Sequence, residues 1–418
     1  MKGNQAQNSF LKGILICVLL LSFTVLIAGG YWIFKSQAPT PLKVVNSAGK
    51  VLTTQEQITG GQAVFQKYGL MDYATVLGHG SYLGPDYTAQ ALKIITDAMH
   101  DHHAQAEYGM DYADLAPEQQ TLIFEKVKAE MKQNRYDKNA KTLVLTDGQA
   151  EGLKRVRAYY DHVFTEGDGR GIQPNLFEND TMPEEGRAYV APGDMRKQIA
   201  DFFFWTAWLS GTQRPGDTIT YTNNWPYFED AGNTMGYSAV LWSGISMTIL
   251  ILVLGIILYF YNRYRLYMQE AYEPGNFPVL DLNRMPVTSS QVKTAKYFLV
   301  VVLLFLIQVG FGALLAHYYV EPNTFFGLDW IVKLFPFNIA KSYHLQLVIL
   351  WVATAWLGMG IYVAPLVGGK EPKRQGLLVD ILFWALVVLT AGSTVGEWLG
   401  AKGYLGNLWF WLGHQGWE

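Results

Sequence analysis

Five long stretches of the chain lack Asp, Glu, Lys and Arg, and they constrain the fold more than any other feature. They comprise residues 13–34, 231–262, 297–320, 342–369 and 381–396. Since about 20 apolar residues are needed to cross roughly 30 Å of hydrocarbon, the first four are long enough to span a bilayer. The fifth, bounded by Asp380 and Glu397, spans it only if its charged ends are drawn in. We therefore predict five transmembrane helices.

The sequence between Lys35 and Asp230 is polar and has the length of one soluble domain. We predict three parts: a membrane anchor helix at 1–34, an extracytoplasmic domain at 35–230, and the start of a transmembrane core at 231–418. Half of the residues are hydrophobic and 14% are aromatic, which is typical of a membrane protein with a polar insert. The expected fold class is mainly α, a polytopic membrane helix bundle with an extracytoplasmic domain.

Positive charges predict the orientation, because loops rich in Lys and Arg stay in the cytoplasm. Such residues precede the first span and follow the second and fourth: Lys2, Lys12, Arg263, Arg265, Arg284, Lys293, Lys370, Lys373 and Arg374. The domain is therefore predicted on the extracytoplasmic side, although Lys333, Lys341 and Lys402 depart from the rule. The first span is longer than a signal-peptide core and is interpreted as an uncleaved anchor.

The composition also excludes two kinds of site. The single cysteine, Cys17, lies in the first span, so the sequence has neither an internal disulfide nor a Cys-x-x-Cys-His attachment site for haem c. The net charge of −3 and the lack of a basic run argue against nucleic-acid binding.

The polar domain has a mainly helical pattern. Capping residues and a first-turn proline predict helices over 53–68, 86–107, 117–134 and 147–164. The segments 167–171 and 191–194, which contain glycine or proline, are predicted turns. The aromatic cluster at 202–205, together with Trp208, fits either a lipid interface or the core of the domain.

A histidine near the start of the fourth stretch is the first candidate for chemistry. His344 lies at the mouth of the predicted span, where an imidazole costs free energy unless it has a partner. Imidazole is the usual axial ligand of b-type haem, and a haem at this position would make the chain an electron carrier. The alternative is a packed, hydrogen-bonded histidine at a helix end.

A second candidate lies at the end of the third span. His317 and Glu321 are four residues apart and converge if the helix continues, and Phe325 follows. A proton acceptor, a hydrogen-bond partner and an aromatic wall are what a hydroquinone headgroup needs; a solvated interfacial pair is the alternative. Because the third span runs outward and the fourth inward, this trio ends on the side where His344 begins, and that favours a quinol site beside a haem.

The polar domain contains a cluster of His100, His102 and His103 with Asp97 and Asp101. His100 and His103 can share a helical face with Asp97, which would suit a metal ion. The segment is polar, however, so a solvated helix face is the alternative.

Three further segments contain candidate residues. The glycine-rich Gly78–Tyr87 is interpreted as a surface or interface loop. In Thr220–Tyr227 the asparagines either form a turn or hydrogen-bond a cofactor carboxylate. In Gly413–Glu418, His414 and Glu418 are a potential ligand pair, unless the chain end is frayed.

Together these segments resemble the quinol-dependent nitric oxide reductases of the haem–copper oxidase superfamily. The resemblance rests on Thr59–Gln66, Gly78–Tyr87, Thr220–Tyr227, the His317, Glu321 and Phe325 trio, the span with His344, and Gly413–Glu418. It implies an N-terminal anchor and an extracytoplasmic domain with a cytochrome c-like fold that lacks haem c. It also implies that His344 is an axial ligand of the low-spin haem b and that the trio forms the quinol-binding pocket.

The resemblance further implies a calcium site. Glu418, Tyr82 and the backbone of Gly80 are expected to contribute oxygen ligands to a calcium ion that ties the domain to haem propionates.

The family continues well past the length of this sequence. Only His317, His344 and His414 lie at or after the third span. Ligands of haem b3, of the non-haem iron and of the second axial position of haem b are therefore expected in a C-terminal half. The chain is expected to be the N-terminal half of the reductase, without catalytic diiron ligands of its own.

The expected function is quinol oxidation and electron delivery through haem b for the reduction of nitric oxide to nitrous oxide, in denitrification or nitric oxide detoxification at the bacterial inner membrane. Expected partners are membrane quinol, nitric oxide, the lipid bilayer and the C-terminal half, and a homodimer is left open. The alternatives are a non-catalytic membrane cytochrome or docking subunit, a membrane-anchored sensor or adhesin, and an oxygen-reducing relative.

Overall fold

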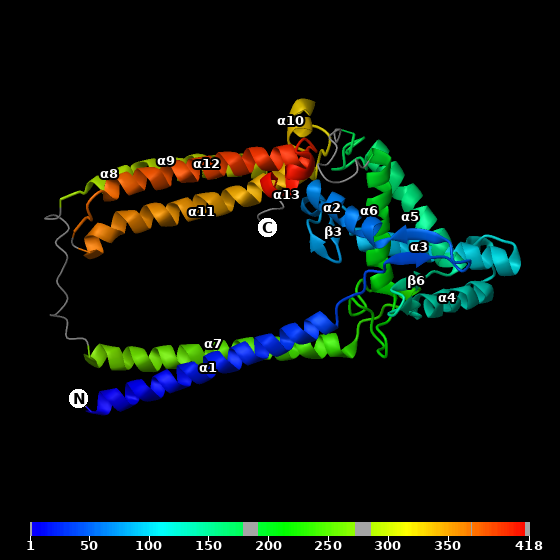
Figure 1. The fold of residues 1–418 in the computed structure, drawn as a ribbon, viewed down its shortest axis with the longest axis horizontal. Helices are drawn as coiled ribbons and strands as arrows, with labels where there is room; N and C mark the ends of the chain where they lie inside the picture. Colours follow the sequence, from blue (N-terminus) through cyan, green and yellow to red (C-terminus); the bar gives the residue numbers. More distant parts are fainter. Residues whose placement is uncertain (1, 179–190, 272–285, 369, 414–418) are drawn as a thin grey trace. The chain divides into compact units, whose positions relative to one another are not determined.

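The computed structural model describes residues 2–178, 191–271, 286–368 and 370–413. The chain divides into two compact units, residues 1–41 and 42–418. The first unit consists of helix α1 (Lys2–Lys35) and the short extended segment that follows it. All other elements belong to the second unit (Figure 1).

The five predicted membrane spans are confirmed. Five of the described helices are long and apolar enough to cross a bilayer: α1, α7 (Tyr237–Ala271), α9 (Ala295–Tyr318), α11 (Phe337–Gly368) and α12 (Gln375–Ala401). Helix α8 (Ser289–Lys293) directly precedes α9, and α10 (Asp329–Leu334) lies between α9 and α11. After α12 come the 3-10 helix η5 (Gly406–Leu408) and the short helix α13 (Trp409–Leu412).

Two spans are longer than their uncharged stretches. Helix α11 begins at Phe337, so His344 lies about two turns inside the helix and not at its mouth. Helix α12 includes Asp380, whose carboxylate pairs with Lys293 and Lys296. A paired carboxylate near a helix end is tolerated within a span, which explains how the fifth stretch reaches the required length.

The predicted helices of the polar domain are confirmed, with starts fixed by their caps. They are α2 (Gln55–Lys67), α3 (Tyr87–Tyr108), α4 (Pro117–Lys132) and α5 (Asp147–Glu166). Thr54 and Thr146 form capping boxes, and the side chain of Asp86 accepts a hydrogen bond from the backbone of Ala89.

The predicted turn at 191–194 is wrong. Pro192 opens helix α6 (Pro192–Gly211), because a proline in the first turn loses no helical hydrogen bond and already has a helical φ angle.

Short strands complete the domain. A sheet has the order β2-β1-β6-β5, formed by β1 (Lys43–Val45), β2 (Val51–Thr54), β5 (Tyr136–Asp137) and β6 (Thr142–Val144). Strand β1 is antiparallel to β2 and parallel to β6, and β5 is antiparallel to β6. Strands β3 (Thr75–Val76) and β4 (His79–Gly80) form a hairpin. The 3-10 helices are η1 (Leu70–Asp72), η2 (Tyr112–Asp114) and η3 (Glu229–Ala231).

Helix α6 supplies the centre of the domain core. Phe202, Phe203, Phe204 and Trp208 are buried, and Phe203 stacks on Tyr87 with ring centroids 4.4 Å apart. Of the two interpretations of this aromatic cluster, the domain core is therefore correct. Burial of large aromatic side chains gives this domain its main hydrophobic stabilisation.

The domain contacts helix α11 through buried hydrogen bonds next to η1. The Asn338 amide donates to the Tyr68 carbonyl over 2.7 Å, and the Ser342 hydroxyl donates to the Asp72 carboxylate over 2.6 Å. Both donors lie in the first two turns of α11, so these bonds fix the part of the helix that contains His344.

Candidate functional site

The imidazole of His344 lies against helix α9. Its Nδ1 is 3.0 Å from the backbone carbonyl oxygen of Gln308, and its Nε2 is 3.4 Å from the Gln308 side-chain amide nitrogen. A carbonyl oxygen can only accept a hydrogen bond, so Nδ1 carries the proton and Nε2 keeps a lone pair. A metal-binding histidine is usually oriented in this way, by a hydrogen bond from its other ring nitrogen to a carbonyl.

Gly312 allows the imidazole of His344 to lie this close to helix α9. A Cβ atom added at Gly312 would lie 3.0 Å from Cε1 of His344, closer than ordinary packing allows. Another glycine of the same helix, Gly310, has open space at the same position. The contact between α9 and α11 at His344 therefore depends on one glycine whose missing side chain leaves room for the ring.

The second predicted group comes together at the end of α9. Nε2 of His317 lies 3.0 Å from a carboxylate oxygen of Glu321, and the ring of Phe325 is centred 5.0 Å from the imidazole. The His317 side chain is 13% exposed and the Glu321 side chain 50%, so one partner is enclosed and the other is accessible. Phe326, which the sequence analysis missed, covers the imidazole at 4.4 Å.

The α9 residues that contact His344 lie in the same half of that helix as His317. His317 follows Gly312 by five residues and Gln308 by nine. At 1.5 Å of rise per residue, the two sites are separated by roughly 8–14 Å along the helix axis. This agrees with the expectation that His317 and Glu321 end the third span on the side where His344 begins the fourth.

Gln308 is the main residue that the sequence analysis missed. Besides its two contacts with His344, its side-chain oxygen accepts a hydrogen bond from the indole nitrogen of Trp351 over 3.2 Å. The available signal was a polar residue in the middle of an apolar span, which normally has a partner on a neighbouring helix.

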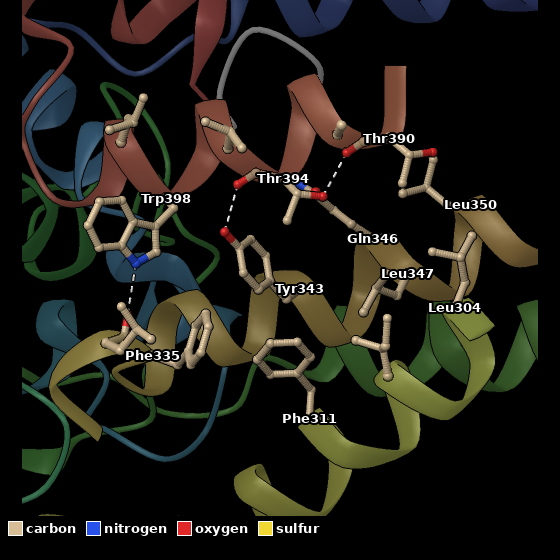
Figure 2. A pocket seen from close by; sticks show the side chains of 15 residues that line it. Leu304, Phe311, Phe335, Tyr343, Gln346, Leu347, Leu350, Thr390, Thr394 and Trp398 are labelled. Atoms are coloured by element: carbon tan, nitrogen blue, oxygen red, sulfur yellow. Dashed lines mark hydrogen bonds between the residues drawn. The ribbon is translucent and has the colours of Figure 1, made fainter. Parts of the chain in front are cut away.

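An apolar groove lies among α9, α11 and α12, next to His344 but not lined by it. Its volume is about 830 Å³, and its walls include Phe311, Tyr343 and Trp398 (Figure 2). The hydroxyl of Tyr343 donates to the backbone carbonyl of Thr394 over 2.6 Å. The groove thus offers apolar surface on a face of α11 other than the one that contains the imidazole.

The expected calcium ligands are only partly described. Glu418 and His414 lie outside the described residues. Tyr82 is 79% exposed, and Gly80 lies in strand β4 with a positive φ of 135°, where an added Cβ would lie 2.3 Å from the Ala74 carbonyl oxygen. The calcium assignment therefore stays a prediction.

The segment Thr220–Tyr227 forms a turn, as one of its two interpretations predicted. Asn223 and Asn224 both have positive φ angles, which asparagine tolerates well. The Asn224 side chain accepts from the backbone nitrogen of Thr220 over 3.0 Å and donates to the Thr234 carbonyl. Trp225 packs against Gly78, so this turn contacts the glycine-rich loop.

The histidine cluster of α3 separates into different environments. His103 pairs with Glu130 at 2.7 Å, and Asp101 pairs with Arg155 at 2.7 Å. His100 is 3% exposed, so the interpretation of the whole cluster as a solvated face is wrong for this residue. Asp97 lies close to His100, as predicted, and Asp230 joins these two residues, whereas His103 pairs with Glu130.

Comparison with known proteins supports the resemblance in both the polar domain and the membrane core. Residues 41–227 match the family model of the cytochrome c-like domain of the nitric oxide reductase chain NorB. Residues 293–418 match the model described as cytochrome c and quinol oxidase polypeptide I. The polar domain is thus similar to the cytochrome c-like domain of a nitric oxide reductase, and the last three spans are similar to the haem–copper oxidases.

A curated relative gives a more detailed comparison. A nitric oxide reductase chain of Stutzerimonas stutzeri is 33% identical over 95 residues, which are 23% of this chain and 19% of that relative. The aligned part is thus a small share of the relative's length. For this reductase-like chain the matches support a mainly α, multi-pass membrane protein with a cytochrome c-like domain.

Proposed function

We propose that the chain is the quinol-oxidising, electron-entry part of a quinol-dependent nitric oxide reductase. The observation that carries the proposal is the placement of two groups against one helix. The imidazole of His344, on α11, contacts Gln308 and Gly312 of α9, and the His317–Glu321 pair lies at the end of α9, roughly 8–14 Å farther along its axis. A proton-accepting pair next to an iron-ligating imidazole is what transfer of electrons from a quinol to a haem requires.

His344 is proposed as an axial ligand of the low-spin haem b. The residue fits this role because its Nδ1 proton is bound by the Gln308 carbonyl, so Nε2 has the lone pair that iron needs. When bound, the haem would accept electrons one at a time and pass them on. The chain's own contribution is to fix the ring through the hydrogen bond from Nδ1 to the Gln308 carbonyl and through the space at Gly312.

His317, Glu321 and Phe325 are proposed to bind the quinol. The accessible carboxylate of Glu321 can accept a proton from a quinol hydroxyl, and His317 holds that carboxylate in place and can accept a second proton. Phe325 and Phe326 give the apolar wall against which a quinol ring can pack. Oxidation of one quinol releases two protons and two electrons.

Those two electrons and two protons suffice to convert two molecules of nitric oxide into nitrous oxide and water. We assign no ligand of the haem b3 and non-haem iron centre to this chain, because only three of its histidines lie at or after the third span. The proposed location is the bacterial inner membrane, with residues 35–230 on the extracytoplasmic side. Calcium binding by Glu418, Tyr82 and Gly80 is part of the same proposal.

The experiment compares two variants in native membranes, where all segments and partners are in place. His344→Ala should abolish the low-spin haem b absorbance. Glu321→Gln should retain that absorbance but slow the reduction of the haem by a quinol. The exposed His162→Ala in α5 is the matched control and should change neither.

Full retention of the low-spin pigment in His344→Ala would overturn the haem assignment. Unchanged haem reduction by quinol in Glu321→Gln, in a protein with normal pigment, would overturn the assignment of the quinol site and leave the haem assignment standing. Nitric oxide and oxygen consumption by the same membranes then distinguish a nitric oxide reductase from an oxygen-reducing relative.

A further inference from the structure

A group of metal-ligating side chains lies in the polar domain, away from the proposed haem and quinol sites. Asp97 and His100 come from α3, and Asp230 comes from η3, far away in the sequence. One potential ligand atom from each residue lies within 4.8 Å of those from the other two. The fold therefore brings one imidazole and two carboxylates to a single point.

His100 is the unusual member of this group. It is 3% exposed, and among the described residues its Nε2 has no hydrogen-bond partner. A buried polar atom without a partner costs about 1–3 kcal/mol, so such an atom in a native protein calls for an explanation, of which a bound ion is one.

The surroundings of His100 suit a neutral ligand with a fixed orientation. Tyr112 stacks on the ring with centroids 4.5 Å apart and planes 11° apart, and the ring of Phe124 is centred 6.1 Å from the imidazole, nearly parallel to it. Burial lowers the pKa of His100, although Asp230 and Asp97 act in the opposite direction. A neutral imidazole is the form that binds metal ions.

The two carboxylates are available to a ligand. Asp97 contacts Lys93 at 2.6 Å, but both side chains are about half exposed, and an exposed ion pair of this kind contributes little stability. The Asp230 carboxylate is partly buried, and its negative charge acts to raise the pKa of both His100 and Tyr112. Two carboxylates close to each other and to a buried imidazole repel one another unless a cation lies between them.

We propose that Asp97, His100 and Asp230 form a binding site for a divalent cation of the zinc class. Nitrogen from one imidazole and oxygen from two carboxylates is a ligand set that zinc accepts at four-coordinate geometry, with water in the fourth position. Calcium and magnesium are less suited, because they favour oxygen ligands throughout.

The site would connect helix α3 to η3, the 3-10 helix that precedes the second span, α7. Helix α3 belongs to the core of the domain, and η3 is followed within a few residues by α7, which begins at Tyr237. A cation held by both would fix the segment that connects the domain to the membrane helix. It would thereby stabilise the folded domain by its binding free energy.

The test uses the full chain, purified in detergent, stripped with a chelator and dialysed against micromolar zinc. Zinc content is measured by mass spectrometry in the wild-type protein and in His100→Gln, Asp230→Asn and two control variants. The wild type should retain roughly one more zinc per chain than either site variant. The controls, His162→Gln and Asp114→Asn, change exposed residues of the same domain and should match the wild type.

A second measurement guards against misfolding. Zinc should raise the melting temperature of the wild type and of both controls, but not that of Asp230→Asn, whose side chain is only partly buried. Equal zinc content in the wild type and in both site variants would overturn the proposal. An Asp230→Asn variant with normal zinc-dependent stabilisation would overturn it as well.

Discussion

The polar domain and the membrane helices are built on opposite principles. In the domain, large side chains such as Phe203 and Tyr160 are buried, and the charged Asp201 is fully enclosed with its partners. In the membrane helices, the buried share of the most apolar part of each span is 0% for α7, 17% for α9 and for α11, and 6% for α12. The domain therefore contains its own stabilising contacts, whereas the spans present most of their surface to the bilayer or to other helices.

This difference predicts where substitutions should have a large effect on stability. Lipid is as apolar as a leucine side chain, so an exposed apolar residue in a span gains little from contacts with its own chain. Leu258 in α7 and Trp356 in α11, which are 66% and 77% exposed, are examples of such residues. Within the spans, a large effect is expected only where two helices meet closely, as they do at His344 and Gly312.

The largest expected effect is a change of Phe203 to alanine. Phe203 is fully buried among aromatic rings, and its removal should cost about 3–5 kcal/mol of the domain's unfolding free energy. Phe23→Ala in α1, whose side chain is 60% exposed, is the matched change in a span and should leave the domain unaffected. Tryptophan fluorescence during denaturation measures both; equal effects would contradict the comparison.

The next effect concerns the buried charge of the domain. Asp201 is 0% exposed and bonds Arg157 at 2.6 Å and Thr53 at 2.6 Å. Asp201→Ala leaves the guanidinium without its partner and should cost about 3–5 kcal/mol. Asp161→Ala, which removes one of the two carboxylate partners of Arg196 at a 62% exposed position, should cost at most about 1 kcal/mol. The domain's thermal transition is the measurement, and similar losses for both variants would refute the prediction.

A smaller effect is expected at the close contact between α9 and α11 beside His344. Gly312→Leu places a side chain where His344 now lies, and overpacking of this kind costs about 1–3 kcal/mol. We expect the haem content of the protein to fall while the domain keeps its thermal transition. Gly310→Leu, at a position with open space, should retain its haem. Equal pigment in the two variants would show that the helix contact does not position the imidazole.

The smallest effect concerns pH. Burial raises the pKa of Glu130, but hydrogen bonds from His103 and Thr146 more than offset this, so its pKa lies below the usual 4.5. Ionised Glu130 thus stabilises the domain above that pH, and the contribution disappears as the pH falls through the lower value of the folded state. Glu130→Gln should cost about 1 kcal/mol at neutral pH. The cost should vanish in acid; a cost independent of pH would exclude this linkage.

Interactions between residues close together in the sequence predicted most of the helices. Thr54 and Asp86 cap the helices that they were predicted to start, and the helix predicted from Asp147 begins there with Thr146 as its cap, because a cap acts through a hydrogen bond within a few residues. The pairing of His317 with Glu321 could also be predicted, since both lie on adjacent turns. The start of α11 at Phe337 could not, because the buried bonds of Asn338 and Ser342 are made with the distant residues Tyr68 and Asp72.

The sequence by itself determined the number of spans, the capped helices and the positions of the candidate histidines, since length, hydropathy and residue spacing act over short distances. Only the tertiary structure decided which residues meet across helices: Gln308 with His344, and Asp230 with His100. Such contacts depend on how two helices pack, and that follows from the shapes of many side chains together. No spacing along the chain specifies it.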